Sequence, residues 1–436
     1  MRVFSRRYCL PKFIFIVICL FLLTNIWAVR FLYFTTTMVR GQKVTINLVM
    51  EGNSEKKTQN PLSAKHDISR MYPAFSYNFH LTSSNNLERA SGVFDLPNMI
   101  VTDRIFLQSK TKVKMVNNKT LKILLYFYDK TMTDEKFQRS QCSVKNCRFV
   151  RKPRDYETAD AVLFKDIPEH LKRPVSKPGQ LWVYYQLESP VHTRRLPEKS
   201  VFNWTATYRP DSTVEAPYGK FGERIFHRKM KLRRNYAKGK TKNIAWFVSN
   251  CDNLNGRMKY VRELRKYIDV DIYGDCGNLT CDRDSVSCMR MLQREYRFYL
   301  AFENSNCRHY ITEKFFKTFS YDVIPIVMGA PLKDYQSIAP THSFIHVDQY
   351  NSPQSLARYL HQLSTDDSMY NKYFEWKKSY ELIDTNFMCR LCVMLHTTDY
   401  VKTQYRNLTK WWREKTCLKP LRNRKEFWTK WTEKEL

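Results

Sequence analysis

Short runs of branched and aromatic residues recur from about residue 120 onward, and polar segments separate them. Apolar runs of this length, bounded by polar residues, are typical of buried strands. Apolar residues at helical spacing also predict helices at 257–267 and 356–363. The order of strand, helix and strand across 243–273 implies parallel pairing, so the sequence predicts an α/β fold. The expected strands are 122–128, 161–164, 181–185, 243–248, 270–273, 298–304 and 323–328.

A longer apolar run lies near the N-terminus, at residues 13–29 with a weaker extension to 34. Its length approaches the roughly 20 residues that a membrane-spanning helix needs. Four basic residues precede this apolar run, and the positive-inside rule keeps the short basic N-terminus in the cytosol. A cleaved signal peptide is the alternative, but 27–30 lacks the small-residue pattern of a cleavage site. We therefore expect a cytosolic tail at 1–12, a transmembrane signal anchor at 13–34 and a luminal body.

Changes of composition divide the rest of the chain. The polar, proline-interrupted stretch from 35 to 119 predicts a stem of low order. Residues 224–242 contain nine Lys or Arg and no acid, which indicates a solvated basic linker. The expected divisions are a stem at 35–119, an N-terminal acceptor-side domain at 120–225, a linker at 226–242, a C-terminal domain at 243–395 and a basic aromatic segment at 396–436.

The chain is strongly basic, with 73 Lys and Arg against 42 Asp and Glu and a formal charge of +31. Such a charge suggests an anionic partner or setting, and nucleic acid is one candidate. Four N-x-Thr sequons instead favour a secretory protein, as does the anchor. These features argue against nucleic acid as a partner. The expected glycan acceptors are Asn118, Asn203, Asn278 and Asn407.

Twelve cysteines point to an oxidising compartment. Cys9 and Cys19 lie in the tail and anchor, which leaves ten for the body. Zinc is an alternative for Cys276, Cys281, Cys288 and Cys307, but their irregular spacing favours disulfides. Four cysteines allow three pairings, and the sequence does not choose among them. The pair Cys389 and Cys392 matches a redox CxxC motif by its spacing.

The segment 298–319 carries the clearest candidate chemistry. Its apolar start predicts a strand, and Phe315, Phe316 and Phe319 fall on one face of a following helix. Thr312 can cap this helix, and Lys314 adds a cation where free backbone N–H groups favour an anion. The segment therefore suits a diphosphate. An ordinary strand-to-helix turn with a solvated Glu–Lys pair fits the local pattern equally well.

The whole string FYLAFENSNCRHYITEK, residues 298–314, closely resembles the signature of the α1,3-fucosyltransferases. This Golgi family transfers L-fucose from GDP-fucose. Further similarity extends over about 122–392, including the Glu-Ser-Pro run at 188–190. The resemblance implies a GT-B fold, in which two Rossmann-like domains face each other across a cleft, and a type II membrane protein with a luminal catalytic body.

Glu188 is the expected general base. It follows the strand 181–185, and open α/β sheets keep their ligands at the carboxyl ends of strands. Pro190 favours an extended Ser189 and so ends the strand. From the residues alone, a surface acid at a strand end is the default interpretation of Glu188. The family resemblance assigns the catalytic role to the Glu of this motif.

The resemblance also implies the donor site. Ser249 and Asn250 match a family Ser-Asn pair, and Arg257 stands eight residues after the serine. By resemblance, Tyr299, Asn304 and Tyr310 lie near the nucleotide and Glu313 near ribose or fucose. Arg257 and Lys314 would hold the diphosphate. No essential cofactor or metal is expected, because the Asp-x-Asp match at 269–271 lies on a strand without further ligands nearby and the match at 282–284 lies in a cysteine-rich loop.

Two details refine this resemblance. Relatives carry two histidines and an arginine where this chain has Phe164 and Lys165, so an acceptor contact there is in question. The pattern of cysteines around the signature is similar to the invertebrate branch that fucosylates the N-glycan core. In the family, the CxxC pair is structural, which suggests that Cys389 and Cys392 pair with Cys142 and Cys147.

We therefore expect an inverting α1,3-fucosyltransferase of the Golgi membrane that acts on N-acetylglucosamine of glycoprotein glycans, either in the N-glycan core or in N-acetyllactosamine. GDP-fucose and glycan acceptors are the expected partners, and a homodimer is left open. Two alternatives are a protein O-fucosyltransferase and a non-catalytic Golgi protein that binds glycans or nucleotide sugars. The presence of Glu188 counts against the second.

Overall fold

The computed structural model describes residues 33–39, 42–49, 119–165, 178–194, 196, 202–224, 234–251, 255–282, 285–397, 405, 407–418 and 431. They belong to two compact units, residues 1–72 and 73–436. In the first unit, β1 (Tyr33–Val39) and β2 (Gln42–Val49) pair antiparallel. These two strands lie largely within the stem predicted at 35–119, at a stretch whose Thr and Val residues favour strand.

The expected tail and nearly all of the expected anchor lie outside the described residues, as do Asn118 and the remaining stem up to 118. Within the part of the chain that the structure describes, no helix combines the length and apolarity needed to cross a membrane.

The second unit contains two five-stranded parallel sheets. The first has the order β4-β3-β5-β6-β7. This is the order 2-1-3-4-5 of a doubly wound α/β fold. Its strands are β3 (Leu121–Leu125), β4 (Cys147–Val150), β5 (Ala161–Phe164), β6 (Leu181–Gln186) and β7 (Trp204–Thr207). The prediction located β3, β5 and β6 and missed β4 and β7, whose sequences CRFV and WTAT contain polar residues and lack the continuous apolar run of β5.

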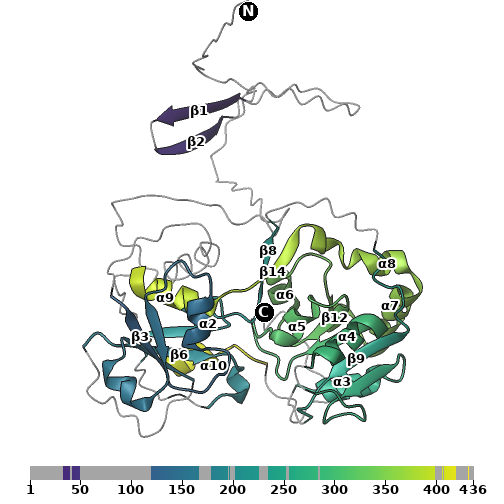
Figure 1. Ribbon diagram of the computed structural model, residues 1–436. Coiled ribbons are helices and arrows are strands. Elements are labelled where there is room, and N and C mark those ends of the chain that lie inside the picture. The colour runs from purple at the N-terminus through teal and green to yellow at the C-terminus, as the bar shows by residue number, and fades with distance from the viewer. Residues whose placement is uncertain are drawn as a thin grey trace, which may run out of the picture. The chain divides into compact units, whose positions relative to one another are not determined.

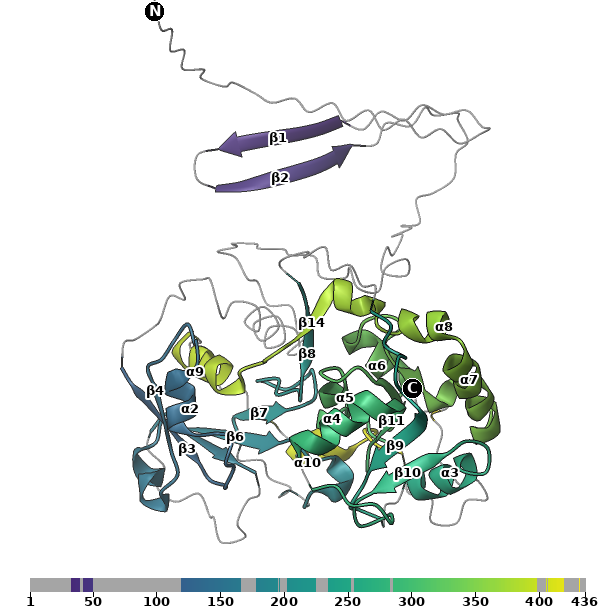
Figure 2. The ribbon, with the colours of Figure 1, turned by 45° about the vertical axis from the view of Figure 1, so that its right-hand side comes forward.

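Both faces of this first sheet are buried, and the C-terminal part of the chain covers them (Figure 1). Alternating residues such as Leu163 and Val183 pack with α9 (Phe387–Thr397) on one face, where α2 (Asp134–Arg139) also lies. Residues such as Phe164 and Trp182 pack with α10 (Leu408–Arg413) on the other. In Figure 2 the yellow α9 again lies against the blue strands. A parallel sheet requires such cover because its strands are apolar on both faces.

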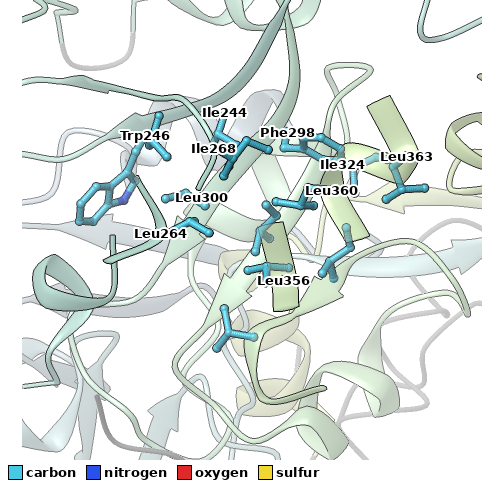
Figure 3. Close-up of a cluster of buried hydrophobic side chains, with 14 of the residues drawn as sticks. Ile244, Trp246, Leu264, Ile268, Phe298, Leu300, Ile324, Leu356, Leu360 and Leu363 are labelled. Carbon is cyan, nitrogen blue, oxygen red and sulfur yellow. The ribbon is translucent and has the colours of Figure 1, made fainter. Parts of the chain in front are cut away.

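The second sheet repeats the same order, as β10-β9-β11-β12-β13. On one face, α3 (Arg257–Leu264) and α7 (Pro353–Thr365) cover the cluster drawn in Figure 3. On the other face, Phe315 and Phe316 of α5 (Glu313–Thr318) are buried, as the sequence predicted. The strands are β9 (Lys242–Phe247), β10 (Val270–Tyr273), β11 (Tyr296–Phe302), β12 (Ile324–Met328) and β13 (Ile345–His346). The remaining helices are α4 (Val286–Glu295), α6 (Leu332–Ile338) and α8 (Asp367–Lys372).

The chain passes between the two halves in a two-stranded antiparallel sheet. β8 (Lys220–Glu223) leaves the first half, and β14 (Tyr380–Ile383) pairs with it on the return (Figure 1). Two Rossmann-like halves therefore make up the body, and the α/β, GT-B expectation is confirmed. Because α9 and α10 pack on the first sheet, we propose that the C-terminal domain ends near residue 386 rather than at 395. Lys240 in the predicted solvated linker is buried, and its ammonium donates to two backbone carbonyls.

All ten cysteines of the body form disulfides. Cys142–Cys389 and Cys147–Cys392 join the first sheet to α9, which confirms the pairing that the resemblance suggested. The other bonds are Cys251–Cys276, Cys281–Cys288 and Cys307–Cys417. The four cysteines near the signature, Cys276, Cys281, Cys288 and Cys307, therefore do not pair only with one another, because Cys276 pairs with Cys251 and Cys307 with Cys417.

The two parallel disulfides predict unequal costs for their removal. With Cys142–Cys389 intact, Cys147–Cys392 closes only the short ring formed by 142–147 and 389–392. Cys147→Ala with Cys392→Ala should therefore cost about 3 kcal/mol of unfolding free energy or less, whereas removing both bonds should cost roughly 5 kcal/mol or more. Guanidinium unfolding under non-reducing conditions measures both. Equal costs would mean that the two bonds do not constrain the same loop.

Candidate functional site

Glu188 lies just beyond the carboxyl end of β6, half-buried where the two halves meet. One carboxylate oxygen, Oε1, accepts hydrogen bonds from the Tyr310 hydroxyl at 2.7 Å, the Ser189 N–H at 2.9 Å and the Asn304 amide at 3.3 Å. No residue in the described ranges donates to the other oxygen, Oε2. Tyr310 and Asn304 come from the signature segment of the second half, so this segment fixes a carboxylate of the first.

The electrostatics of Glu188 favour the ionised form. Burial raises the pKa of its carboxyl, but the hydrogen bonds from Tyr310, the Ser189 N–H and Asn304 outweigh burial, and His192 adds to them. The net effect lowers the pKa below the ordinary value for glutamate. Glu188 is therefore a carboxylate at neutral pH, with one oxygen held in place and one available.

A second contact between the halves lies directly beside this carboxylate. The Ser305 hydroxyl donates to the Ser189 hydroxyl at 2.7 Å, and both serines are buried. Ser305 also donates to the Asn304 side-chain oxygen at 2.9 Å, which orients the Asn304 amide toward Glu188. These contacts bring Glu188, Asn304 and Tyr310 together. From the sequence, Asn304 and Tyr310 were expected near the nucleotide, and neither was linked to Glu188.

The C-terminal segment holds the signature loop in this position. The Cys307–Cys417 disulfide joins them, the Arg308 N–H donates to the Thr416 carbonyl, and the Leu418 N–H donates to the Asn306 carbonyl. Because Thr416 lies three residues after the end of α10, these bonds attach the loop to a helix that packs on the first sheet. No pattern in the sequence indicated this role for residues 407–418.

Ser249, Asn250 and Arg257 follow β9 at the point where the strand order of the second sheet reverses. Ligands of doubly wound sheets bind at this point. The Ser249 and Asn250 side chains are exposed. Arg257 is only 3% exposed, and its guanidinium donates to the Phe302 carbonyl at 3.0 Å and to the Asn250 carbonyl at 2.8 Å. Its Nε is buried and has no hydrogen-bond partner among the described residues.

Lys314 is held by acids. Its ammonium lies 3.2 Å from Glu303 Oε2 and 3.7 Å from Glu313 Oε1. Burial lowers the pKa of Lys314, but Glu303 and Glu313 outweigh burial and raise it. The positive charge of Arg257 lowers the pKa of Lys314. Burial, Glu313 and Glu303 together raise the pKa of Tyr299. The predicted donor residues Arg257, Tyr299, Glu313 and Lys314 therefore lie in one electrostatic neighbourhood.

Glu303, at the centre of this neighbourhood, was not predicted as a site residue. It is fully buried, and it accepts hydrogen bonds from the Thr312 N–H at 2.8 Å and the Thr312 hydroxyl at 2.9 Å. Thr312 caps α5 as predicted, but one N–H at this helix start binds Glu303 and is not free for an anion. An acid directly after an apolar strand was the available signal.

The other sequence candidates vary in their surroundings. Asn278 and Asn407 are exposed, as glycan acceptors must be, whereas Asn203 accepts a hydrogen bond from the Trp182 N–H within the first sheet. In the Asp-x-Asp match at 269–271, Asp271 accepts a hydrogen bond from Tyr296 at 2.5 Å. The middle and last residues of the second match, 283 and 284, lie outside the described residues.

Comparison with known proteins identifies the class to which these two halves belong. The family model "Fucosyltransferase, N-terminal" matches residues 118–219, and "Glycosyltransferase family 10 (fucosyltransferase) C-term" matches residues 237–411. The glycoprotein 3-alpha-L-fucosyltransferase A of Drosophila melanogaster is 46% identical over 64% of this chain and 56% of its own length. The human 4-galactosyl-N-acetylglucosaminide 3-alpha-L-fucosyltransferase 9 is 31% identical over 74% of this chain and 88% of its own length.

A crystal structure of an alpha1,3-fucosyltransferase with GDP-fucose aligns with 71% of this chain at 15% identity and a TM-score of 0.45. This chain spans just over half the length of the first Drosophila relative. From the two family models and the human relative, the chain belongs to glycosyltransferase family 10, the fucosyltransferases. The higher identity with the Drosophila protein supports the invertebrate branch.

The two hydrogen bonds from Arg257 to carbonyls predict that lysine cannot replace it. Arg257→Lys keeps the positive charge, but the lysine ammonium lacks the planar guanidinium group and cannot donate to both carbonyls at once. Loss of one hydrogen bond from a charged group should lower the unfolding free energy by about 1.5–3 kcal/mol. Arg262→Lys on the exposed side of the same helix is the control for denaturant unfolding. Equal, small effects in both variants would mean that the guanidinium does not brace this loop.

Proposed function

We propose that this protein is an inverting α1,3-fucosyltransferase that moves L-fucose from GDP-β-L-fucose to N-acetylglucosamine of glycoprotein glycans. The observation that carries the proposal is Glu188, an ionised carboxylate with one fixed oxygen and one available oxygen, held by the family signature segment. Membership in the fucosyltransferase family supports the reaction class.

In the proposed reaction, Glu188 Oε2 takes the proton of an acceptor hydroxyl. The hydroxyl oxygen bonds to the anomeric carbon of fucose on the face opposite GDP, while the bond from that carbon to the β-phosphate oxygen breaks. GDP leaves as an anion, and the linkage changes from β to α. General base assistance of this type contributes about 10² to 10⁴ in rate.

We place the donor on the second half, at the carboxyl ends of β9 and β11. Arg257 and Lys314 would carry the diphosphate, and the buried, unpartnered Nε of Arg257 leaves one donor for it. Ser249, Asn250, Tyr299, Asn304, Tyr310 and Glu313 would surround the nucleotide and sugar. Two fixed cations can stabilise a departing diphosphate. We therefore propose that transfer requires no divalent metal.

The acceptor and the location are further parts of the proposal. The Drosophila relative is named for glycoprotein acceptors, and its identity exceeds that of the human relative named for a galactosylated N-acetylglucosaminide. This supports glycoprotein glycans as acceptors. The apolar segment 13–34, the exposed Asn278 and Asn407 and the five disulfides support a luminal body anchored in the Golgi membrane.

Replacing the proposed base tests this function. Glu188→Gln keeps the shape of the side chain but cannot take a proton, so transfer should fall by about 10² or more while GDP affinity stays the same. Fucose transfer and isothermal titration with GDP measure the two effects. Glu157→Gln, which changes an exposed acid of the same half, is the control. Joint loss of transfer and GDP binding would assign Glu188 a structural role instead.

Tyr310→Phe tests the electrostatics of the base. The wild-type carboxylate should remain ionised, and transfer should hold, until pH falls below the usual glutamate pKa of about 4.3. Without the hydrogen bond from Tyr310, burial raises the pKa of Glu188, so the acid limb of the kcat/KM profile should move to higher pH by about one pH unit. Tyr335→Phe alters a buried tyrosine that does not contact Glu188 and should leave the limb in place. An unmoved limb in Tyr310→Phe would contradict the proposed role of Glu188.

A further inference from the structure

Glu303 is a fully buried acid that lies directly after β11. Its Oε1 accepts the Thr312 N–H, and its Oε2 accepts both the Thr312 hydroxyl and the Lys314 ammonium. Lys314 also donates to the Thr312 hydroxyl at 3.0 Å. With no exposed surface, the Glu303 side chain does not touch a ligand directly, and the groups that its carboxylate holds are Thr312 and Lys314.

Burying a carboxylate is costly unless it is paired and hydrogen-bonded. Burial raises the pKa of Glu303, and Lys314 and the two Thr312 hydrogen bonds counteract part of this effect. A neutral, apolar pair would serve stability equally well or better in many proteins. The charge therefore calls for a reason other than stability.

The backbone around Glu303 is built to hold it. Gly329 has φ +150°, and a Cβ there would lie 2.8 Å from Glu303 Cβ, so only glycine leaves room for the glutamate. The Trp431 indole N–H donates to the Gly329 carbonyl at 2.8 Å, and the Asn255 amide donates to the Glu303 carbonyl at 2.9 Å. Asn255 also accepts from the Arg257 N–H. Glu303 is thus linked to the loop that carries Arg257.

We propose that Glu303 is a positioning residue that holds the Lys314 ammonium in place for the diphosphate of the donor. This inference rests on the proposed function. Lys314 is 27% exposed and contacts Glu313 on its open side, so a phosphate can replace Glu313 while Glu303 keeps its contact. The lysine side chain is then already ordered before the diphosphate binds, so binding does not lose further side-chain entropy.

The sign of the effect on GDP affinity separates positioning from simple charge balance. Glu303→Gln removes a negative charge near an anionic ligand, which by charge alone would tighten GDP binding. A positioning role predicts the opposite. The Kd for GDP should rise about tenfold to a hundredfold, the value of one hydrogen bond to a charged group.

The test measures GDP affinity, and KM and kcat for fucose transfer, on the purified full-length protein. For Glu303→Gln we expect KM for GDP-fucose to rise with Kd while KM for the acceptor is unchanged. Asp322→Asn is the matched control, because Asp322 is a buried acid of the same half that pairs with Lys377 and Arg234. It should lose stability but keep GDP affinity. An unchanged or lower Kd in Glu303→Gln overturns the inference.

A double-mutant cycle excludes a general loss of fold. Lys314→Met should weaken GDP binding, and adding Glu303→Gln to it should change the Kd by less than about twofold, because the partner that Glu303 positions is gone. Additive losses would mean that Glu303 acts independently of Lys314 and would overturn the proposal.

Gly329→Ala covers the case in which Glu303→Gln does not fold. It displaces Glu303 without removing its charge, and the Kd for GDP should again rise, whereas an unchanged Kd in the folded variant counts against positioning. The proposed function fails separately, if the wild-type protein itself neither binds GDP nor transfers fucose.

Discussion

The hydrogen bond from Tyr310 to Glu188 joins the two halves of the protein at the place where a donor and an acceptor would meet. The proposed base, Glu188, comes from one sheet and its orientation from the other, so neither half alone contains the complete carboxylate site. The bond also sets the charge of Glu188, because its contribution helps to offset the burial that would otherwise favour the protonated acid. The position and the ionisation of the base therefore depend on the same contact.

This contact requires the signature loop to stay near the first sheet, and the C-terminal chain provides that constraint. A parallel sheet with apolar strands has to be covered on both faces. Here α9 and α10 supply cover for the first sheet after the chain has formed the second. The segment after α10 then binds the loop through Cys307–Cys417 and two backbone hydrogen bonds. The chain that covers the first sheet therefore also holds the signature loop of the second half in position.

Local patterns were sufficient to predict β9, β10, β11 and β12 of the second half, the phenylalanine face of α5 and the Thr312 cap, but not the two-residue β13. They also placed Glu188 at a strand end, although its role came from the family resemblance. Sequence patterns could not reveal that Glu303 accepts a hydrogen bond from the Thr312 N–H at the start of α5, because this contact depends on how the loop between β11 and α5 folds back. The same limit applies to α9 and α10, whose apolar residues do not show which sheet they cover. β4 includes a charged residue among its four positions, CRFV, so it lacks the continuous apolar run that marked the equally short β5.

The most direct test of this account is the stereochemistry of transfer by the full-length protein from GDP-β-L-fucose to a glycopeptide with the N-glycan core, in the presence of EDTA. N-acetyllactosamine is the parallel acceptor. NMR of the product should show fucose α-linked to N-acetylglucosamine of the glycopeptide at a rate that EDTA does not change. A β-linked product, or no transfer to either acceptor by a protein that binds GDP, would contradict the assignment of Glu188 as the base of an inverting transferase.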